Sequence, residues 1–352
     1  MTTRVRFTTL AALAAIASLG LVACGAEPGE SPSDTSKSED SASTATDSST
    51  DTPEPETYEI AITQFLEHPS LDAITQGFKD ALEEKGVKVN YSYESASGDQ
   101  ANTQTIAGQF AADPGLDLIV AVATPSAQAM VNAVTDRPVL FAGITDPVSA
   151  GLVPSWEASR TNVTGTSDLN PEGRPAALVV EIMGQGDVKT IGFPYSLGEK
   201  NSEVQLEALI AEATPLGITV KDAGIAASSE LATGLESLTG VDAIFVGTDN
   251  AVVTGMEQVV AFCQEHQIPL FVADTASVAR GAVASRGIDY YELGKRTGDM
   301  AYEILVNGVS PGAIPPLQVT DTQIVANPDA AASFGITIPA SALEGAEIVT
   351  AE

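Results

Sequence analysis

The sequence has few cysteine, histidine, aromatic and basic residues, and each shortage weighs against a class of protein. Two cysteines and two histidines among 352 residues leave no recognisable zinc-ligand spacing. Lysine and arginine total 16 against 47 aspartate and glutamate, and the net charge of −31 argues against nucleic acid binding and leaves no basic patch for anionic lipid. Aromatic residues make up 5% of the chain, which weakens a sugar site built from several aromatic platforms.

Nucleotide and catalytic motifs are also missing. The chain contains no P-loop and no G-x-G-x-x-G fingerprint. The stretch 308–312 matches G-x-S-x-G, but Ser310 follows a predicted helix and precedes Pro311, and both His68 and His266 come earlier in the chain. A nucleophile elbow needs its serine between a strand and a helix. We therefore expect no enzyme activity, no catalytic residue, no cofactor and no metal.

The start of the chain carries the features of a secretory signal. Arg4 and Arg6 precede an apolar segment at 8–19, which is too short to span a membrane as a stable helix. The following LVACG at 21–25 resembles the cleavage site of bacterial lipoproteins, in which the cysteine carries lipid. We therefore predict a signal peptide at 1–23 and a lipidated, palmitate-bearing Cys24.

The next segment, 24–57, predicts a disordered tether. It consists almost entirely of Ser, Thr, Asp, Glu and Pro, and it cannot bury enough apolar surface to fold. Such a tether behind a lipid would hold a soluble domain at the outer face of the cytoplasmic membrane. Lipidation of Cys24 leaves no thiol partner for a disulfide. Cys263 lies among Val259, Val260 and Phe262, so we expect a buried core thiol.

The rest of the chain alternates between strands and helices. Residues 118–122 are all apolar and too short for a helix, which is typical of a strand buried on both faces of a parallel sheet. Thr124 and Pro125 suit the N-cap and first position of a following helix, whose N-terminus would face the carboxyl edge of the sheet, where open α/β sheets bind ligands. Thr124 and Ser126 could equally serve only as caps. Further strands are predicted at 60–65, 87–93, 139–144, 190–193, 218–223, 243–246, 269–273 and 323–326.

Helices are predicted between these strands, with one of them starting at Asn170-Pro171 and a longer one within 287–307. The short polar stretch 161–165 is interpreted as a passage to a second unit. Strand–helix alternation that occurs twice predicts an α/β protein with two lobes, each a parallel sheet covered by helices.

Several short motifs, taken together in their order and spacing, resemble one family. They are QFLEHP at 64–69, ATPSAQ at 123–128, TDPVSAGL at 145–152, NVTG at 162–165, NS at 201–202, TDN at 248–250 and GIDYYELG at 287–294. The chain from about 58 to 339 is similar to the solute-binding lipoproteins of ABC importers that take up tryptophan or tyrosine.

This resemblance implies a type I periplasmic-binding fold: two Rossmann-like lobes joined by three interlobe crossings, near 162–165, 285–288 and 317–321. Lobe 1 would comprise 58–163 and 287–319, and lobe 2 would comprise 164–286 and 320–352. The protein would be a monomer that binds a free, aromatic amino acid between the lobes. Its partners would be an ABC permease and its ATPase. A nucleoside- or sugar-binding protein of the same fold, or a membrane-tethered sensor, remains an alternative.

A free amino acid needs an anion site, a cation site and a slot for its side chain. For the carboxylate, helix N-termini and hydroxyl groups are suitable, since they stabilise an anion without a counter-charge. The candidates are Thr124, Ser126 and Thr145 in lobe 1 and Ser196, Asn201 and Ser202 in lobe 2.

For the ammonium group, we expect a carboxylate after a strand: Asp274 first and Asp249 second, although each could instead cap the helix that follows it. Tyr195 could bond the amine, stack on an aromatic side chain, or lie at the lobe surface. Phe65 and Glu67 could line the slot, although Phe65 could equally belong to the core. His68 could lie with Glu67 at the rim of this slot, but we favour His68 as the N-cap of its helix.

Overall fold

The computed structural model describes residues 57–320 and 322–350. The predicted signal peptide, Cys24 and all but the last residue of the predicted tether lie outside the described residues. Within the described ranges, no helix combines the length and the apolar character needed to cross a bilayer.

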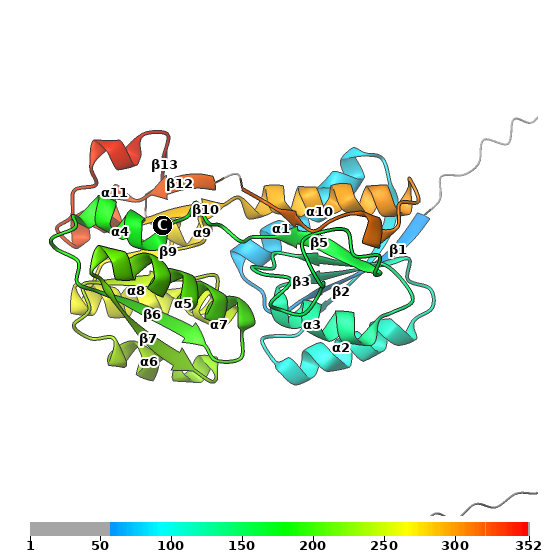
Figure 1. The fold of residues 1–352 in the computed structure, drawn as a ribbon, viewed down its shortest axis with the longest axis horizontal. Coiled ribbons are helices and arrows are strands. Elements are labelled where there is room, and N and C mark those ends of the chain that lie inside the picture. The colour runs from blue at the N-terminus through cyan, green and yellow to red at the C-terminus, as the bar shows by residue number, and fades with distance from the viewer. Residues whose placement is uncertain (1–56, 321, 351–352) are drawn as a thin grey trace, which may run out of the picture. The chain divides into compact units, whose positions relative to one another are not determined.

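The first sheet has six strands in the order β11-β5-β4-β3-β1-β2, and every neighbouring pair is parallel. The strands are β1 (Thr57–Gln64), β2 (Lys88–Ser95), β3 (Leu118–Val122), β4 (Val139–Ala142), β5 (Val163–Ser167) and β11 (Leu317–Gln318). The helices are α1 (Pro69–Glu84), α2 (Gln100–Ala112), α3 (Thr124–Ala133) and α10 (Tyr290–Leu305). Figure 1 shows α1 and α10 on one face of this sheet and α2 and α3 on the other. We call this assembly lobe 1.

The second sheet has seven strands in the order β13-β12-β10-β9-β8-β6-β7, and among these pairs only β10 and β12 run antiparallel. The strands are β6 (Thr190–Ser196), β7 (Thr219–Ile225), β8 (Ala243–Val246), β9 (Leu270–Val272), β10 (Ala284–Ile288), β12 (Thr322–Ala326) and β13 (Glu347–Ile348). The helices are α4 (Pro175–Met183), α5 (Lys200–Ala213), α6 (Leu231–Ser237), α7 (Asn250–Thr254), α8 (Met256–His266), α9 (Ala276–Ala279) and α11 (Pro328–Ser333). We call this assembly lobe 2.

Each lobe is held together by apolar side chains from both faces of its sheet. The core of lobe 1 forms one cluster around the β1, β3 and β4 side chains. Lobe 2 has two clusters: one includes residues of α6 and α8, and the other includes residues of α4 and α5. Cys263 lies in the first of these as a buried free thiol, as expected, and burial raises its pKa to about 12. The predicted α/β architecture with two mostly parallel sheets is therefore confirmed.

The predicted crossing at 162–165 is wrong, because these residues enter β5, a fully buried strand of the first sheet. Its polar side chains have partners: Thr164 Oγ1 donates to the Ile314 carbonyl, and the Thr166 and Thr297 hydroxyls are 2.7 Å apart. At Gly165, any Cβ would overlap the Phe141 carbonyl oxygen of β4. The chain therefore passes from the first sheet to the second only after Ser167.

Three other local predictions need correction. Strand β6 continues to Ser196 rather than ending at 193, so Tyr195 and Ser196 are strand residues and not loop residues. The helix expected from Asn170-Pro171 begins at Pro175, after Arg174 in a left-handed conformation. Thr124 is the first residue of α3 rather than its N-cap; Ala123 takes the cap position and makes no side-chain hydrogen bond.

Helices α1 and α10 pack at unusually close range in lobe 1. Modelling a Cβ on Gly294 of α10 would overlap the Ile74 carbonyl oxygen, and one on Gly77 of α1 would overlap the Tyr291 carbonyl oxygen. Glycine therefore lets the two backbones touch. Because α10 follows β10 of the second sheet, this contact holds the first turns of α10, just after one passage between the lobes, against the middle of α1.

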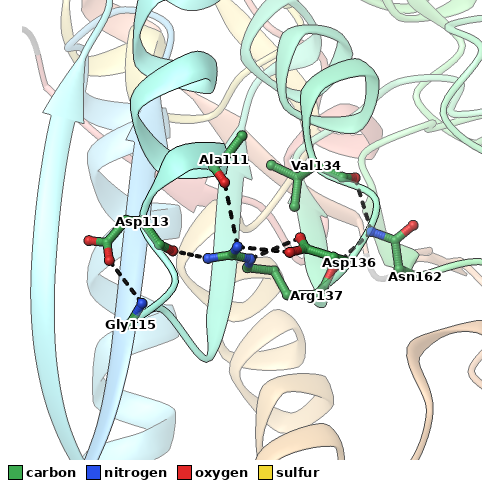
Figure 2. Close-up of polar contacts among 7 residues, drawn as sticks. All are labelled: Ala111, Asp113, Gly115, Val134, Asp136, Arg137 and Asn162. Atoms are coloured by element: carbon green, nitrogen blue, oxygen red, sulfur yellow. Dashed lines mark hydrogen bonds and ion pairs between the residues drawn. The ribbon is translucent and has the colours of Figure 1, made fainter. Parts of the chain in front are cut away.

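At the edge of lobe 1 where the strands begin, Arg137 connects the end of α2 to the segment before β4 (Figure 2). Arg137 donates to the carbonyl oxygens of Ala111 and Asp113, at the end of α2, and forms a 3.0 Å ion pair with Asp136. Asn162 donates to the carbonyl of Val134 and to that of Arg137. These contacts hold the C-terminal ends of α2 and α3 beside the first residues of β4 and β5. They lie at the amino edge of the sheet, opposite the carboxyl edge where ligands bind in open α/β sheets.

Candidate functional site

Loops at the carboxyl ends of strands from both sheets surround one narrow cavity, whose volume is about 350 Å³ when the solvent-filled space at its mouth is counted. Its lining includes four residues predicted from the sequence: Thr124, Thr145, Asn201 and Asp274. The other lining residues are His68, Ser70, Leu71, Ala123, Gly143, Asp168, Thr248, Asn250, Val253 and Tyr290. We call this the head-group cavity. None of its lining residues is lysine or arginine, so an anion bound here would depend on backbone dipoles and hydroxyl groups.

Asp274 is buried between the lobes and keeps one carboxylate oxygen unpaired. Its Oδ1 accepts a 3.1 Å hydrogen bond from Ser70 Oγ of lobe 1 and one of 2.9 Å from the Ser277 amide of α9. The capping alternative considered from the sequence is thus also realised. Its Oδ2 is buried without a hydrogen-bond partner among the described residues. A buried, unpaired carboxylate oxygen is costly, so this atom is a candidate partner for a cation.

A second carboxylate of the cavity, Asp168, was not singled out by the sequence analysis. Asp168 directly follows β5. Because 162–165 was interpreted as a crossing and not as part of a strand, Asp168 was not considered among the polar residues that follow strands. Thr145 Oγ1 donates to its Oδ1 and the Tyr290 hydroxyl donates to its Oδ2, each at 2.9 Å. Burial raises the pKa of Asp168, and these two hydrogen bonds partly oppose the shift.

Asp249 lies at the N-terminus of α7 with its carboxylate fully engaged. It accepts from the Ser196 amide and hydroxyl at 2.6 and 2.8 Å, from Ser202 Oγ at 2.7 Å, and from the Val252 amide at 2.9 Å. The structure thus places Asp249, Ser196 and Ser202 together as one capping cluster, and none of the three lines the head-group cavity. These contacts match the helix-cap alternative for Asp249.

Next to this cluster lies the carboxylate of Glu199, which no motif or spacing in the sequence singles out. Glu199 is 3% exposed, and it accepts from the Asn201 side chain, from the Asn250 amide and side chain, and from the Ala251 amide. Burial and the charge of Asp249 raise the pKa of Glu199 to about 8. Asn250 in turn lies 3.4 Å from His68 Nε2 of lobe 1.

His68 occupies the N-cap position of α1, as predicted, but its side chain makes no capping hydrogen bond. It is buried instead at the lobe boundary beside Asn250, and its Nδ1 has no partner among the described residues. Burial lowers the pKa of His68, opposed in part by the charge of Asp274. The imidazole therefore lines the head-group cavity, so the alternative position at the edge of the ligand site is realised together with the N-cap position.

The four remaining predicted residues do not line the head-group cavity. Phe65 is part of the lobe 1 core, and Glu67 is exposed. Tyr195 packs against Phe193 with ring centroids 6.1 Å apart, on the sheet of lobe 2. Ser126 is buried in the first turn of α3, and its Oγ has no partner among the described residues.

The backbone at the start of α3 is strained where it meets the cavity. Ala123, a lining residue, has φ 73° and ψ 153°, a conformation that L-residues rarely adopt. Such strain costs on the order of 1–3 kcal/mol and is found mostly at functional sites. It brings the N-terminal turn of α3, with Thr124, to the cavity wall, where helix amides stabilise an anion.

A larger cavity adjoins the first. Its volume is about 860 Å³ when the solvent-filled space at its open mouth is counted. The two cavities share Thr145, Asp168, Thr248 and Tyr290. Beyond these four residues, the larger cavity extends into lobe 2 between α4, α5 and the sheet.

Known proteins resemble this chain over most of its length. Residues 59–350 match the family model for ABC transporter substrate binding proteins. The chain is 40% identical to the tyrosine-binding protein of Clostridioides difficile (strain R20291) over 275 residues, covering 77% of this chain and 79% of that protein.

Two solved structures of substrate-binding proteins are also similar to this chain. An ABC domain from Streptococcus pneumonia in complex with L-Trp is 38% identical, with a TM-score of 0.80, and a ligand-free, open substrate-binding protein with adhesive properties from Clostridium difficile is 40% identical, with a TM-score of 0.63. Each alignment covers 84% of this chain and 100% of the other. Such substrate-binding proteins are extracytoplasmic and are generally not enzymes. The chain belongs to the family of ABC transporter substrate-binding proteins.

Proposed function

We propose that this protein binds a free amino acid with an aromatic side chain between its lobes and delivers it to an ABC permease. The single observation that carries the proposal is the head-group cavity, which combines unpaired acceptor atoms with a helix N-terminus. Asp274 Oδ2 and Asn201 Oδ1 are both buried without partners among the described residues, and both residues line the cavity. An ammonium group supplies the donors that these oxygens lack.

The opposite charge of the ligand is accommodated in the same cavity. The N-terminal turn of α3, with the Thr124 hydroxyl, offers donors to a carboxylate. Thr145 is already committed to Asp168, so it contributes by holding that carboxylate in place. A cavity that offers donors to an anion and a free carboxylate oxygen to a cation fits a zwitterion better than it fits a sugar or a nucleoside.

The relatives support both the ligand class and the closed arrangement. One relative is named a tyrosine-binding protein and one structure contains L-Trp. The present structure agrees better with the L-Trp complex, at a TM-score of 0.80, than with the ligand-free open structure, at 0.63. Hydrogen bonds that connect the lobes, such as Ser70 to Asp274, are consistent with a closed form.

The cellular setting follows from the same proposal. A lipid on Cys24 and the acidic tether would keep the monomeric binding domain at the outer face of the cytoplasmic membrane, next to a permease and its ATPase. For the lobe limits, we propose that 164–167 belong to lobe 1 and 287–288 to lobe 2, and the pairing of β5 with β4 and of β10 with β12 supports this division.

The proposal is tested by isothermal titration calorimetry with L-tyrosine, L-tryptophan, glucose and a nucleoside. We expect binding of an aromatic amino acid only, and at least a tenfold loss, about 1.4 kcal/mol, for Asp274→Asn. Asp222→Asn, an exposed carboxylate of lobe 2, is the matched control and should bind as the unaltered protein does. An Asp274→Asn variant with undiminished affinity, or a protein that binds glucose and neither amino acid, would contradict the proposal.

A further inference from the structure

The larger cavity has an apolar body and a polar end. The polar end consists of Asp168, Thr145, Thr248 and Tyr290, which also line the head-group cavity. The body is lined largely by apolar residues, namely Leu169, Pro171, Pro175, Leu178, Val204, Ala208, Phe245, Val272 and Ile288. Because the head group of an amino acid would be held at the polar end, its side chain is directed toward the apolar body.

The apolar body suits an aromatic ring. Leu178 of α4 and Phe245 of β8 are buried members of the lobe 2 core, so the wall they form is already ordered. Val204 of α5 is only half-buried, and Ala208, one turn further along α5, is exposed, so the mouth of the cavity opens between α4 and α5. A ring that enters here removes its own apolar surface and that of the wall from water.

One polar atom in the wall lacks a partner. Asn170 follows β5 and lines this cavity, and its Nδ2 donates to the Arg286 carbonyl at 2.9 Å. This contact fixes the orientation of the amide, since only the NH₂ end can donate to a carbonyl oxygen. The other end, Asn170 Oδ1, is buried without a hydrogen-bond partner among the described residues. Oδ1 is therefore an unpaired acceptor on a residue that lines the cavity.

We propose that this cavity, which we call the side-chain cavity, holds the ligand side chain, and that Asn170 selects a ring with a hydrogen-bond donor. The inference rests on the proposed function and deepens it. A phenol or an indole satisfies Asn170 Oδ1, whereas a phenyl ring leaves it unpaired and buried. A site built to bind a ligand O–H or N–H discriminates strongly against the analogue that lacks it.

The location of the side chain is tested by narrowing the cavity. Val204→Trp should weaken L-tyrosine and L-tryptophan binding at least tenfold in calorimetry. Ile210→Phe is the matched control, since it enlarges an exposed residue of the same helix that does not line the cavity. Ala208→Phe, at an exposed position, gives a second filling variant if Val204→Trp does not fold. Unchanged affinities in a folded filling variant would overturn the assignment.

The role of Asn170 is tested by the ratio of L-tyrosine to L-phenylalanine affinity. We expect the unaltered protein to prefer L-tyrosine or L-tryptophan over L-phenylalanine at least tenfold. Asn170→Leu should abolish this preference, and Asn170→Asp, which keeps an acceptor but loses the bond to Arg286, should retain it. A preference that survives in Asn170→Leu, or disappears equally in both variants, would refute the selective role.

The two proposals can fail separately. If the unaltered protein binds no amino acid at all, the proposed function fails. If it binds aromatic amino acids and the filling variants bind them equally well, only the assignment of the side-chain cavity fails.

Discussion

Glu199 should make the stability of this protein fall as the pH rises. Its carboxyl group is buried at the joined N-termini of α5 and α7, facing Asp249, Asn201 and Asn250. Burial and the charge of Asp249 raise its pKa from 4.5 to about 8. The protonated form is therefore the one that the folded state favours.

The sign and size follow from proton linkage. An acid whose pKa is higher in the folded state contributes stability that is fully present below its unfolded pKa and is lost as the pH rises through the folded value. For Glu199 the window runs from about 4.5 to about 8. One proton gives a slope of at most about 1.4 kcal/mol per pH unit in the free energy of unfolding. Glu199→Gln removes this proton and should flatten the curve.

The measurement is urea unfolding at pH 5, 6, 7 and 8, without ligand, for the unaltered protein and Glu199→Gln. Taking the difference between the two proteins cancels other titrating groups, including buried His68, whose pKa shifts downward and whose effect has the opposite sign. Glu203→Gln alters a carboxylate of the same helix that is paired with Lys200 at the surface, and should track the unaltered protein. Parallel curves for Glu199→Gln and the unaltered protein across this range would refute the reasoning.

Two further predictions concern the packing of lobe 1 and the membrane anchor. Gly294→Ala forces a Cβ against the Ile74 carbonyl of α1 and should lower the free energy of unfolding by about 2–3 kcal/mol in chemical denaturation. Gly108→Ala, on an open face of α2, is the control and should raise the free energy of unfolding by about 0.5–1 kcal/mol. Similar changes for both variants would contradict the close helix contact. Cys24→Ser should release the protein into the medium, as followed by immunoblotting of membrane and medium fractions, and continued membrane retention would count against a lipid anchor.

The sequence predicted the sheets well, because the strands of a parallel sheet are buried on both faces. The runs 118–122 and 243–246 are continuous apolar segments, and the structure has strands with these same bounds. β5 was not predicted, because its sequence VTGTS is mostly polar and lacks the apolar run that marks the other buried strands, although every residue is buried. Its hydroxyl groups bond to distant residues, Ile314 and Thr297, and no local pattern reports such partners.

The site was predictable only in part, because residue type and position do not determine hydrogen-bond partners. Asp249 and Asp274 each follow a strand and each cap a helix, so the sequence alone could not decide which of the two would bind the ligand ammonium group. In the structure the Asp249 carboxylate is saturated by four donors, while Asp274 keeps Oδ2 free of any partner among the described residues. Asp168 was not predicted because β5 was not predicted, and site residues were sought directly after the predicted strands.

We expect ligand binding and lobe closure to be linked through the two oxygens of Asp274. Ser70, in the first turn of α1, bonds to Oδ1 across the lobe boundary, and Oδ2 is the atom proposed to take the ligand ammonium. With Ser70 on Oδ1 and an ammonium group on Oδ2, both oxygens of this buried carboxylate would have a donor, and the cost of a buried, unpaired oxygen would be removed. Since α1 lies backbone to backbone against α10, the helix that follows the passage from β10, the Ser70 contact is tied to a rigid part of that passage. A solute without a cationic group would leave Asp274 Oδ2 buried and unpaired in the closed form, so we expect it to bind more weakly than an amino acid does.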